Sequence, residues 1–202
     1  MNRVGLVILV YLTLALASAL STYLLHGDVL LGEDAWLGLS PVAAHAYGAL
    51  LGVTFGLVVA RVTPGWVSRS TWARQLQAEL SPLARGLSPG AVLAVAGLSA
   101  LGEELLFRAL LLPVVGLVPQ AALFGLAHQL PGRARWIWVL WASIMGLVLG
   151  VLYRTTGSIL GPILAHAVIN ALNLRYMQNH EVVTTPRPLG GVLGRDVSGQ
   201  RS

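Results

Sequence analysis

The sequence predicts an all-α, polytopic membrane protein, a bundle of about six transmembrane helices. Of its 202 residues, 55% are hydrophobic and only 10% are charged, whereas a soluble domain has about 25% charged residues. The mean hydropathy is +0.73. Apolar runs recur along the chain at lengths close to the roughly 20 residues that a helix needs to cross a bilayer.

The charge and cysteine counts exclude several classes of function. With no cysteine, the chain can form no disulfide, thiolate nucleophile or thiolate metal site. A metal ion would have to be held by histidine and carboxylate side chains. The net charge of +5 does not predict nucleic-acid binding, because the arginines gather at the ends of apolar runs, where they set membrane topology.

Residues 1–87 are expected to hold two transmembrane helices and an interfacial segment. The first span covers residues 4–25, and its Ala17-Ser18-Ala19 also fits a signal-peptidase site. Apolar sequence continues beyond this tripeptide, so we favour a retained helix. An acidic connector leads to a second span from about Pro41 to Ala60, where arginine and proline follow.

Two patterns in this part predict packing. Glycines recur every fourth residue at Gly48, Gly52 and Gly56, which is typical of a close-packed face between membrane helices. Further on, Trp72, Leu76 and Leu80 lie on one helical face of a more polar stretch. That spacing fits a helix lying on the cytoplasmic surface of the membrane, with a polar loop as the alternative.

Residues 88–176 are predicted to form the catalytic helix core. Ser88-Pro89 is a typical helix start. The third span is expected to run to Leu112, the fifth over residues 136–153 and the sixth over 158–174, with a turn at Thr156-Gly157-Ser158 before it. Between the third and fifth spans we expect a short helix over residues 119–128. This helix either crosses only part of the membrane or begins earlier, near Val114. Residues 177–202 are expected to be a flexible cytoplasmic tail.

The arginine distribution predicts the orientation. Six crossings place all arginines except Arg154 on one side, and by the positive-inside rule both termini are then cytoplasmic. The compactness of the chain, with little sequence outside the core, suggests a bacterial protein, which we expect in the inner membrane.

Two acids and a base interrupt the third span at Glu103, Glu104 and Arg108. Each charge costs about 2.5–3.5 kcal/mol at the centre of a membrane helix, and ionisable residues there are usually functional. Glu104 and Arg108 are four residues apart and can pair along one face. Glu103 lies about 100° around the helix and is free to point elsewhere.

Partners for Glu103 occur on two later apolar segments. Phe124 and His128 are four residues apart, and so are His166 and Asn170. Each histidine alone fits an ordinary hydrogen bond between helices, but the combination suits hydrolysis of an amide. A base can take a proton from water, and donors can stabilise the oxyanion. Because no serine or threonine in these motifs lies beside a base, we favour activated water over a covalent intermediate.

Three motifs resemble those of the CPBP intramembrane proteases, also called Abi or CAAX-protease-like. They are Glu-Glu-x-x-x-Arg at 103–108, Phe-x-x-x-His at 124–128 and His-x-x-x-Asn at 166–170, and the resemblance covers about residues 88–175. It implies an intramembrane endopeptidase acting on a membrane-anchored protein. The family includes the eukaryotic enzyme that trims prenylated CAAX proteins, but for a compact bacterial chain we expect other substrates, such as C-terminal sorting signals cleaved by myxosortase-like relatives.

The resemblance also implies roles for the site residues. Glu103 would be the general base together with His128, Glu104 and Arg108 would orient Glu103, and His166 and Asn170 would line the oxyanion site. No cofactor is favoured. The alternative is a metalloprotease in which Glu103, His128 and His166 hold zinc. Other readings are a non-catalytic bacteriocin-immunity or scaffold protein of the same fold, and a transporter, which the absence of repeated broken helices disfavours.

Overall fold

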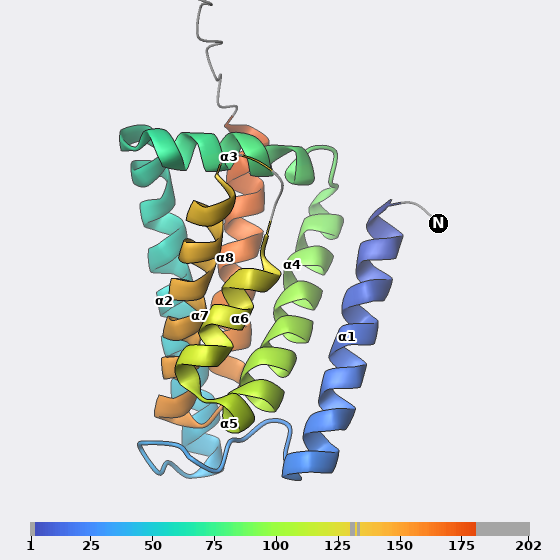
Figure 1. Cartoon of the computed structure of the whole chain (residues 1–202), viewed down its shortest axis with the longest axis vertical. Helices are drawn as coiled ribbons and strands as arrows, with labels where there is room; N and C mark the ends of the chain where they lie inside the picture. The colour runs from blue at the N-terminus through green and yellow to red at the C-terminus, as the bar shows by residue number, and fades with distance from the viewer. Residues whose placement is uncertain (1–2, 130–131, 133, 181–202) are drawn as a thin grey trace, which may run out of the picture.

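A computed structural model describes residues 3–129, 132 and 134–180. Over these residues the chain is helical and contains no strand. Figure 1 shows long helices standing side by side, with α3 lying across one end of the bundle. The elements are α1 (Arg3–His26), α2 (Pro41–Arg69), α3 (Thr71–Ala84), α4 (Pro89–Glu104), the π-helix η1 (Leu105–Leu111), α5 (Leu112–Val115), α6 (Leu117–Ala127), α7 (Arg135–Thr156) and α8 (Leu160–Asn179).

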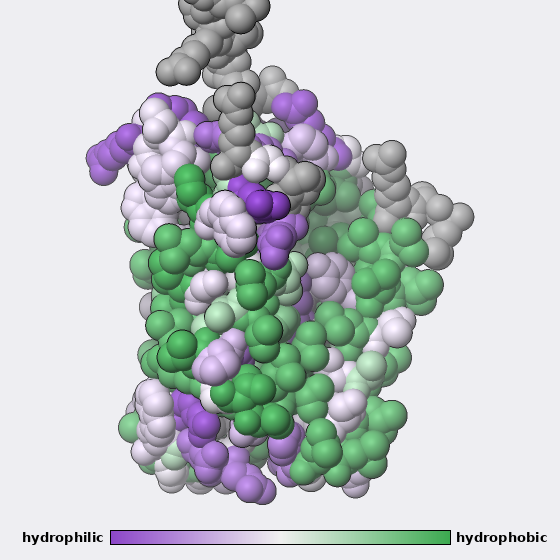
Figure 2. Space-filling model, in the orientation of Figure 1, coloured by the Kyte–Doolittle hydropathy of each residue, from purple (hydrophilic) through white to green (hydrophobic). Residues whose placement is uncertain are grey.

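The surface of the bundle is that of a membrane protein. Four helical segments are long and apolar enough to cross a bilayer: Val4–His26, Pro41–Arg69, Pro89–Val115 and Arg135–Thr156. Figure 2 shows an apolar band around the middle and hydrophilic residues gathered at the two ends. The all-α membrane fold is therefore confirmed, while six crossings stay a prediction.

The two ends of the described chain lie at the same end of the bundle. Figure 1 shows the start of α1 and the end of α8 both near α3. A hydrogen bond from Gln77 Nε2 on α3 to the carbonyl oxygen of His180 (2.8 Å) ties α8 to this end. That this end is cytoplasmic stays a prediction from the arginine distribution.

Helix α2 is longer than expected, and the predicted stop at Ala60 is wrong as a helix end. The helix continues through Pro64 to Arg69. Proline removes one backbone donor, and the hydroxyl of the preceding Thr63 donates to the carbonyl oxygen of Val59 at 2.9 Å. The Trp66 ring packs edge-on against Trp141 of α7, with centroids 4.9 Å apart, so tertiary contacts hold the extension.

Helix α3 is the predicted surface helix, and the polar-loop alternative is wrong. Its buried face is rotated from the predicted one, because Ala73, Leu76 and Ala84 are buried whereas Trp72 is exposed. An exposed tryptophan at the end of a bundle suits a membrane interface. Both carboxylate oxygens of Glu79 on α3 lie 3.3 Å from the backbone nitrogen of Ala134, which ties α3 to the start of α7.

The third span begins as predicted and then departs from α-helix. The Ser88 hydroxyl accepts from the nitrogen of Ala91 at 3.2 Å, and Pro89 is the first helical residue. Beyond Glu104 the helix widens into η1, in which the Leu112 nitrogen donates to the carbonyl oxygen of Phe107, five residues back. The helix continues to Val115, so Leu112 is not its end.

Gly116 separates the third span from α6. Its φ of +85° favours glycine, and α6 starts directly after it, at Leu117. Pro119 was expected to begin this helix, but it lies within the first turn, where a missing N–H does no harm. The turn before α8 is as predicted, with Gly157 in the left-handed region at φ +77°.

Helix α8 extends to Asn179, past the expected start of the tail at residue 177. Residues 181–202 of the predicted tail lie outside the described residues.

The glycine face predicted on α2 is confirmed. A methyl group at Gly52 would overlap the carbonyl oxygen of Gly161 on α8, and one at Gly56 would come within 2.9 Å of the carbonyl oxygen of Ala165. Their backbones therefore pack directly together. His45 Nδ1 lies 2.8 Å from Ser158 Oγ in the turn before α8, so its role is structural and its contact is at the end of the bundle.

Candidate active site

Two imidazoles converge on one carboxylate oxygen of Glu103. Glu103 Oε2 lies 3.3 Å from His128 Nε2 and 3.9 Å from His166 Nε2. The three side chains come from α4, the end of α6 and α8. The structure thus brings together three residues that the sequence predicted as a cluster.

The second ring nitrogen of His128 fixes how the ring is protonated. His128 Nδ1 lies 2.7 Å from the carbonyl oxygen of Phe124, one turn earlier. A carbonyl oxygen only accepts, so Nδ1 carries a hydrogen and Nε2 is left to face Glu103. The contact between Nε2 and a carboxylate is attractive only when one proton lies between them. Glu103 and His128 are therefore arranged as a proton-sharing pair.

His166 is held in the same manner by the other glutamate. Its Nδ1 lies 2.7 Å from Glu104 Oε1, so Nδ1 donates and Nε2 is directed toward Glu103. Glu104 was expected to orient Glu103. Its side chain contacts His166 and Arg108, so an influence on Glu103 would pass through the His166 ring, and the orienting role stays a prediction.

Arg108 is fully buried, and both of its terminal nitrogens have hydrogen-bond partners, whereas its Nε has none among the described residues. Its Nη1 donates to Glu104 Oε1 at 3.0 Å, which is the predicted pair four residues apart, and its Nη2 donates to the carbonyl oxygen of Gly146 on α7 at 3.2 Å. Its guanidinium lies 4.4 Å from the centre of the Phe124 ring. These contacts offset the desolvation of a charge that would otherwise be very costly in this interior.

Exposure separates the two glutamates. The side chains of Glu104 and Arg108 are 0% exposed, whereas Glu103 is 11% and His128 21% exposed. Only the second pair can meet water or a substrate. Glu104 and Arg108 therefore belong to the support of the site, and Glu103 and His128 form its accessible part.

The Phe124 ring lies at the centre of the cluster. Its centroid is 5.0 Å from the Phe107 ring, 4.4 Å from the His128 ring and 5.9 Å from the His166 ring. These rings restrict the motion of both imidazoles and provide the apolar surround in which electrostatic interactions are strong. The phenylalanine of the second motif thus has a packing role specific to the site.

Asn170 contacts a residue that sequence reasoning missed. Its Nδ2 donates to Ser99 Oγ at 3.2 Å. Ser99 is four residues before Glu103 and Asn170 is four residues after His166, so the two lie one turn away on the same pair of helices. The position of Ser99, one turn from Glu103 in an apolar helix, is the signal that could have found it.

Two further polar residues were also missed. The Tyr11 side chain on α1 lies beside Glu103 and interacts with its carboxylate, although the motifs lie far away in sequence. Gln120 is fully buried one turn before Phe124, and its Nε2 donates to the carbonyl oxygen of Gly146 at 3.1 Å. Neither residue belongs to one of the charged motifs. The only sequence signal for either is a single polar side chain within an apolar helix.

The donor set of Glu103, His128 and His166 matches the ligand spacing of a tetrahedral zinc ion at one contact and exceeds it at another. Two ligands on one tetrahedral zinc ion lie about 3.3 Å apart, given Zn–N and Zn–O bonds near 2.0–2.1 Å. The His128–Glu103 separation matches this value and the His166–Glu103 separation of 3.9 Å exceeds it. Among residues 3–129, 132 and 134–180, no group of three or more histidine, cysteine or acidic side chains has the arrangement of a metal site.

Comparison with known proteins agrees with the motifs. Residues 86–172 match the family model described as type II CAAX prenyl endopeptidase Rce1-like. No match was found among curated proteins or among solved structures. The matched region contains all six predicted site residues and confirms the resemblance inferred from the three motifs. Together with its apolar helices, this makes the chain an integral membrane protein with an Rce1-like endopeptidase domain of the CPBP family at residues 86–172.

Proposed function

We propose that this protein is an intramembrane endopeptidase that hydrolyses a peptide bond of a membrane-anchored protein with water activated by Glu103 and His128. The observation that carries the proposal is the convergence of two imidazole Nε2 atoms on Glu103 Oε2, at 3.3 and 3.9 Å. General acid–base catalysis needs a proton acceptor within hydrogen-bond reach of the nucleophile. A partly exposed Glu103 beside His128 meets that need.

In the proposed reaction, the pair of Glu103 and His128 takes one proton from water as the oxygen bonds to the scissile carbonyl carbon. The carbonyl oxygen becomes an oxyanion. When the tetrahedral intermediate collapses, the C–N bond breaks and the same pair returns the proton to the leaving nitrogen. The products are a carboxylic acid and an amine, and the proton-sharing arrangement of Glu103 and His128 suits both transfers.

The oxyanion would be stabilised by His166 and Asn170. With Nδ1 of His166 bound to Glu104, a His166 ring that is protonated during the reaction would present its Nε2–H to the site. An amide nitrogen carries two hydrogens, so Asn170 keeps a second donor beyond the one directed at Ser99. Preorganised donors of this kind account for a large part of the rate in many hydrolases.

A zinc-dependent version of the protease is the second candidate, with Glu103, His128 and His166 as ligands. It is supported by the fixed Nδ1 atoms of both histidines, since metal-bound histidines usually donate their other ring hydrogen to a carboxylate or carbonyl. A bound zinc ion would polarise the scissile carbonyl and activate water. The 3.9 Å separation between His166 and Glu103 favours the metal-free version.

The substrate and setting belong to the proposal too. We infer a bacterial inner-membrane enzyme with cytoplasmic termini, whose substrates carry a cleavage site next to a transmembrane helix. C-terminal sorting signals of surface proteins are the substrate class that we favour. The Rce1-like match makes prenylated CAAX peptides the class to test alongside it.

A membrane-proteome comparison tests the proposal. Strains would carry the wild type, Glu103→Gln, or the control Glu33→Gln, which replaces an exposed glutamate of the α1–α2 connector. We expect uncleaved precursors to accumulate with Glu103→Gln alone, at unchanged protein level. Normal processing in the Glu103→Gln strain would contradict the proposal and leave a non-catalytic immunity or scaffold role.

A further inference from the structure

The inward face of α1 carries polar and small residues. Tyr11, Ala15, Ser18 and Thr22 follow one another at helical spacing, and the last three are only 5%, 3% and 1% exposed. The leucines of the opposite face, such as Leu16 and Leu24, are more than two-thirds exposed. A helix that only anchors the chain in lipid needs no such polar face.

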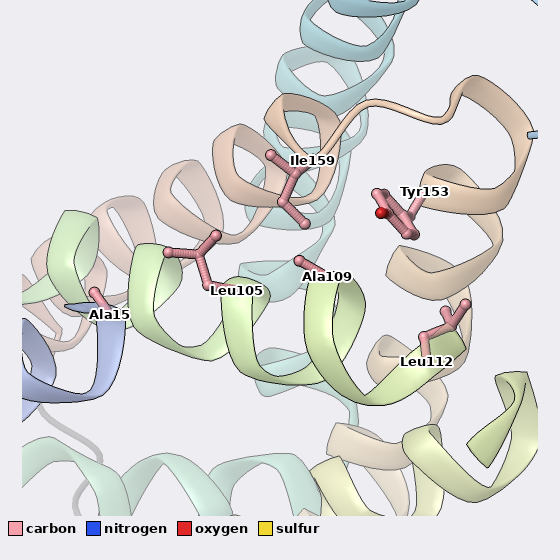
Figure 3. Packing of buried hydrophobic residues seen from close by; sticks show 6 residues of the cluster. All are labelled: Ala15, Leu105, Ala109, Leu112, Tyr153 and Ile159. Carbon is pink, nitrogen blue, oxygen red and sulfur yellow. The ribbon is translucent and has the colours of Figure 1, made fainter. Parts of the chain in front are cut away.

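The face packs directly against the helix that carries the glutamates. Figure 3 shows Ala15 of α1 next to Leu105, and both belong to one buried cluster with Ala109. At Gly102 an added methyl group would lie 3.1 Å from the carbonyl oxygen of Tyr11 and 3.5 Å from the nitrogen of Ala15. Glycine next to Glu103 therefore allows the two backbones to approach closely.

This approach brings the Tyr11 side chain to the site. Its hydroxyl group lies beside the carboxylate of Glu103 and interacts with it electrostatically, and the carbonyl oxygen of Tyr11 lies against Gly102, the residue before Glu103. Glu103 is thereby contacted from α1 by a phenol, from the end of α6 by His128 and from α8 by His166. A donor on the α1 side would help to hold the carboxylate toward the imidazoles.

We propose that Tyr11 is a positioning residue for Glu103, supplied by the N-terminal helix, and that α1 is thus a part of the active site. Tyr11 lies outside residues 86–172, the region that matches the family model. The inference rests on the proposed role of Glu103 as the base. It also requires that α1 stays in the mature protein, because cleavage after Ala19 would remove Tyr11.

The direct test compares Tyr11→Phe with Tyr23→Phe, a matched change at a tyrosine of the same helix that is 62% exposed. Removing a hydroxyl donor that faces a charged group corresponds to about a 10- to 100-fold change. We expect Tyr11→Phe to lower kcat by that factor with little change in KM. Because a donor favours the charged carboxylate, the acid limb of the kcat–pH profile should move to higher pH. Tyr23→Phe should change neither.

A second variant covers the case in which Tyr11→Phe fails to fold. Gly102→Ala keeps the hydroxyl and displaces α1 from Glu103, so it should also lower kcat more than KM. N-terminal sequencing of the active enzyme should find Tyr11 present. A wild-type kcat and pH profile in a folded Tyr11→Phe or Gly102→Ala variant, or an active enzyme that lacks residues 1–19, would overturn the inference.

The same assay separates this inference from the proposed function. If Glu103→Gln is inactive and Tyr11→Phe matches the wild type, only the role of Tyr11 is wrong. If Glu103→Gln cleaves as the wild type does, the proposed mechanism is wrong and the role of Tyr11 is lost with it.

Discussion

His166 Nδ1 and Glu104 Oε1 lie 2.7 Å apart, and the same carboxylate oxygen accepts from Arg108 at 3.0 Å. One buried oxygen thus joins α8 to α4 and η1. The side chain of Glu104 is fully buried, whereas that of Glu103 is 11% exposed. The two adjacent acids therefore lie in different environments. Glu104 contacts the histidine of α8, and Glu103 is the acid that we propose for the chemistry.

The first prediction concerns the buried pair. Arg108→Ala leaves the Glu104 carboxylate buried without its cation, and breaking a buried pair in this way costs about 3–5 kcal/mol. We expect a large drop in the unfolding midpoint of the purified protein in detergent. The control is Arg154→Ala, which breaks the exposed pair with Asp34 and should cost no more than about 1 kcal/mol. Equal midpoints for both variants would show that the buried pair does not support the fold.

The second prediction distinguishes the role of Asn170 from that of Ser99, to which its side chain donates. Asn170→Ala removes a proposed oxyanion donor and should lower kcat about 100- to 1,000-fold. Ser99→Ala removes only the group that holds Asn170 at 3.2 Å, so about a tenfold loss is expected. Steady-state kinetics would measure both, with Asn173→Ala on the same helix as the control. A loss for Ser99→Ala as large as for Asn170→Ala would contradict these roles.

The third prediction tests the packing of α2 on α8. Gly52→Ala places a methyl group against the carbonyl oxygen of Gly161, and overpacking of this kind costs about 1–3 kcal/mol. Since α8 carries His166, activity should fall together with the unfolding midpoint. Gly97→Ala is the matched control, because a methyl group there meets nothing within 4 Å and should stabilise α4 by about 0.5–1 kcal/mol. A Gly52→Ala protein as stable as the control would mean that the two helices do not need this contact.

The fourth prediction concerns zinc. If the metal-free mechanism holds, elemental analysis of the purified active protein should find far less than one zinc per chain, and a chelator should leave the activity unchanged. The reason is the separation of 3.9 Å between His166 and Glu103, which exceeds the roughly 3.3 Å between two ligands of a tetrahedral zinc ion. Stoichiometric zinc that is lost together with the activity would establish the metalloprotease instead.

The local patterns of the sequence predicted much of this protein. Helical spacing paired Glu104 with Arg108 and left Glu103 free, and both results hold in three dimensions. The cap at Ser88 and the glycine turn at Gly157 were also predicted. These features depend on residues within about one helical turn of each other, and the chain encodes such relations directly.

Contacts between distant segments were decided by the tertiary structure alone. Helix α2 continues through Pro64 because Trp66 packs on α7, and η1 follows Glu104 without any break in the apolar pattern. Glu104 turns to His166, and Tyr11 reaches Glu103 across 92 positions. The physical reason is that helical periodicity fixes which face a residue occupies, whereas the packing of one helix on another fixes which residue it meets.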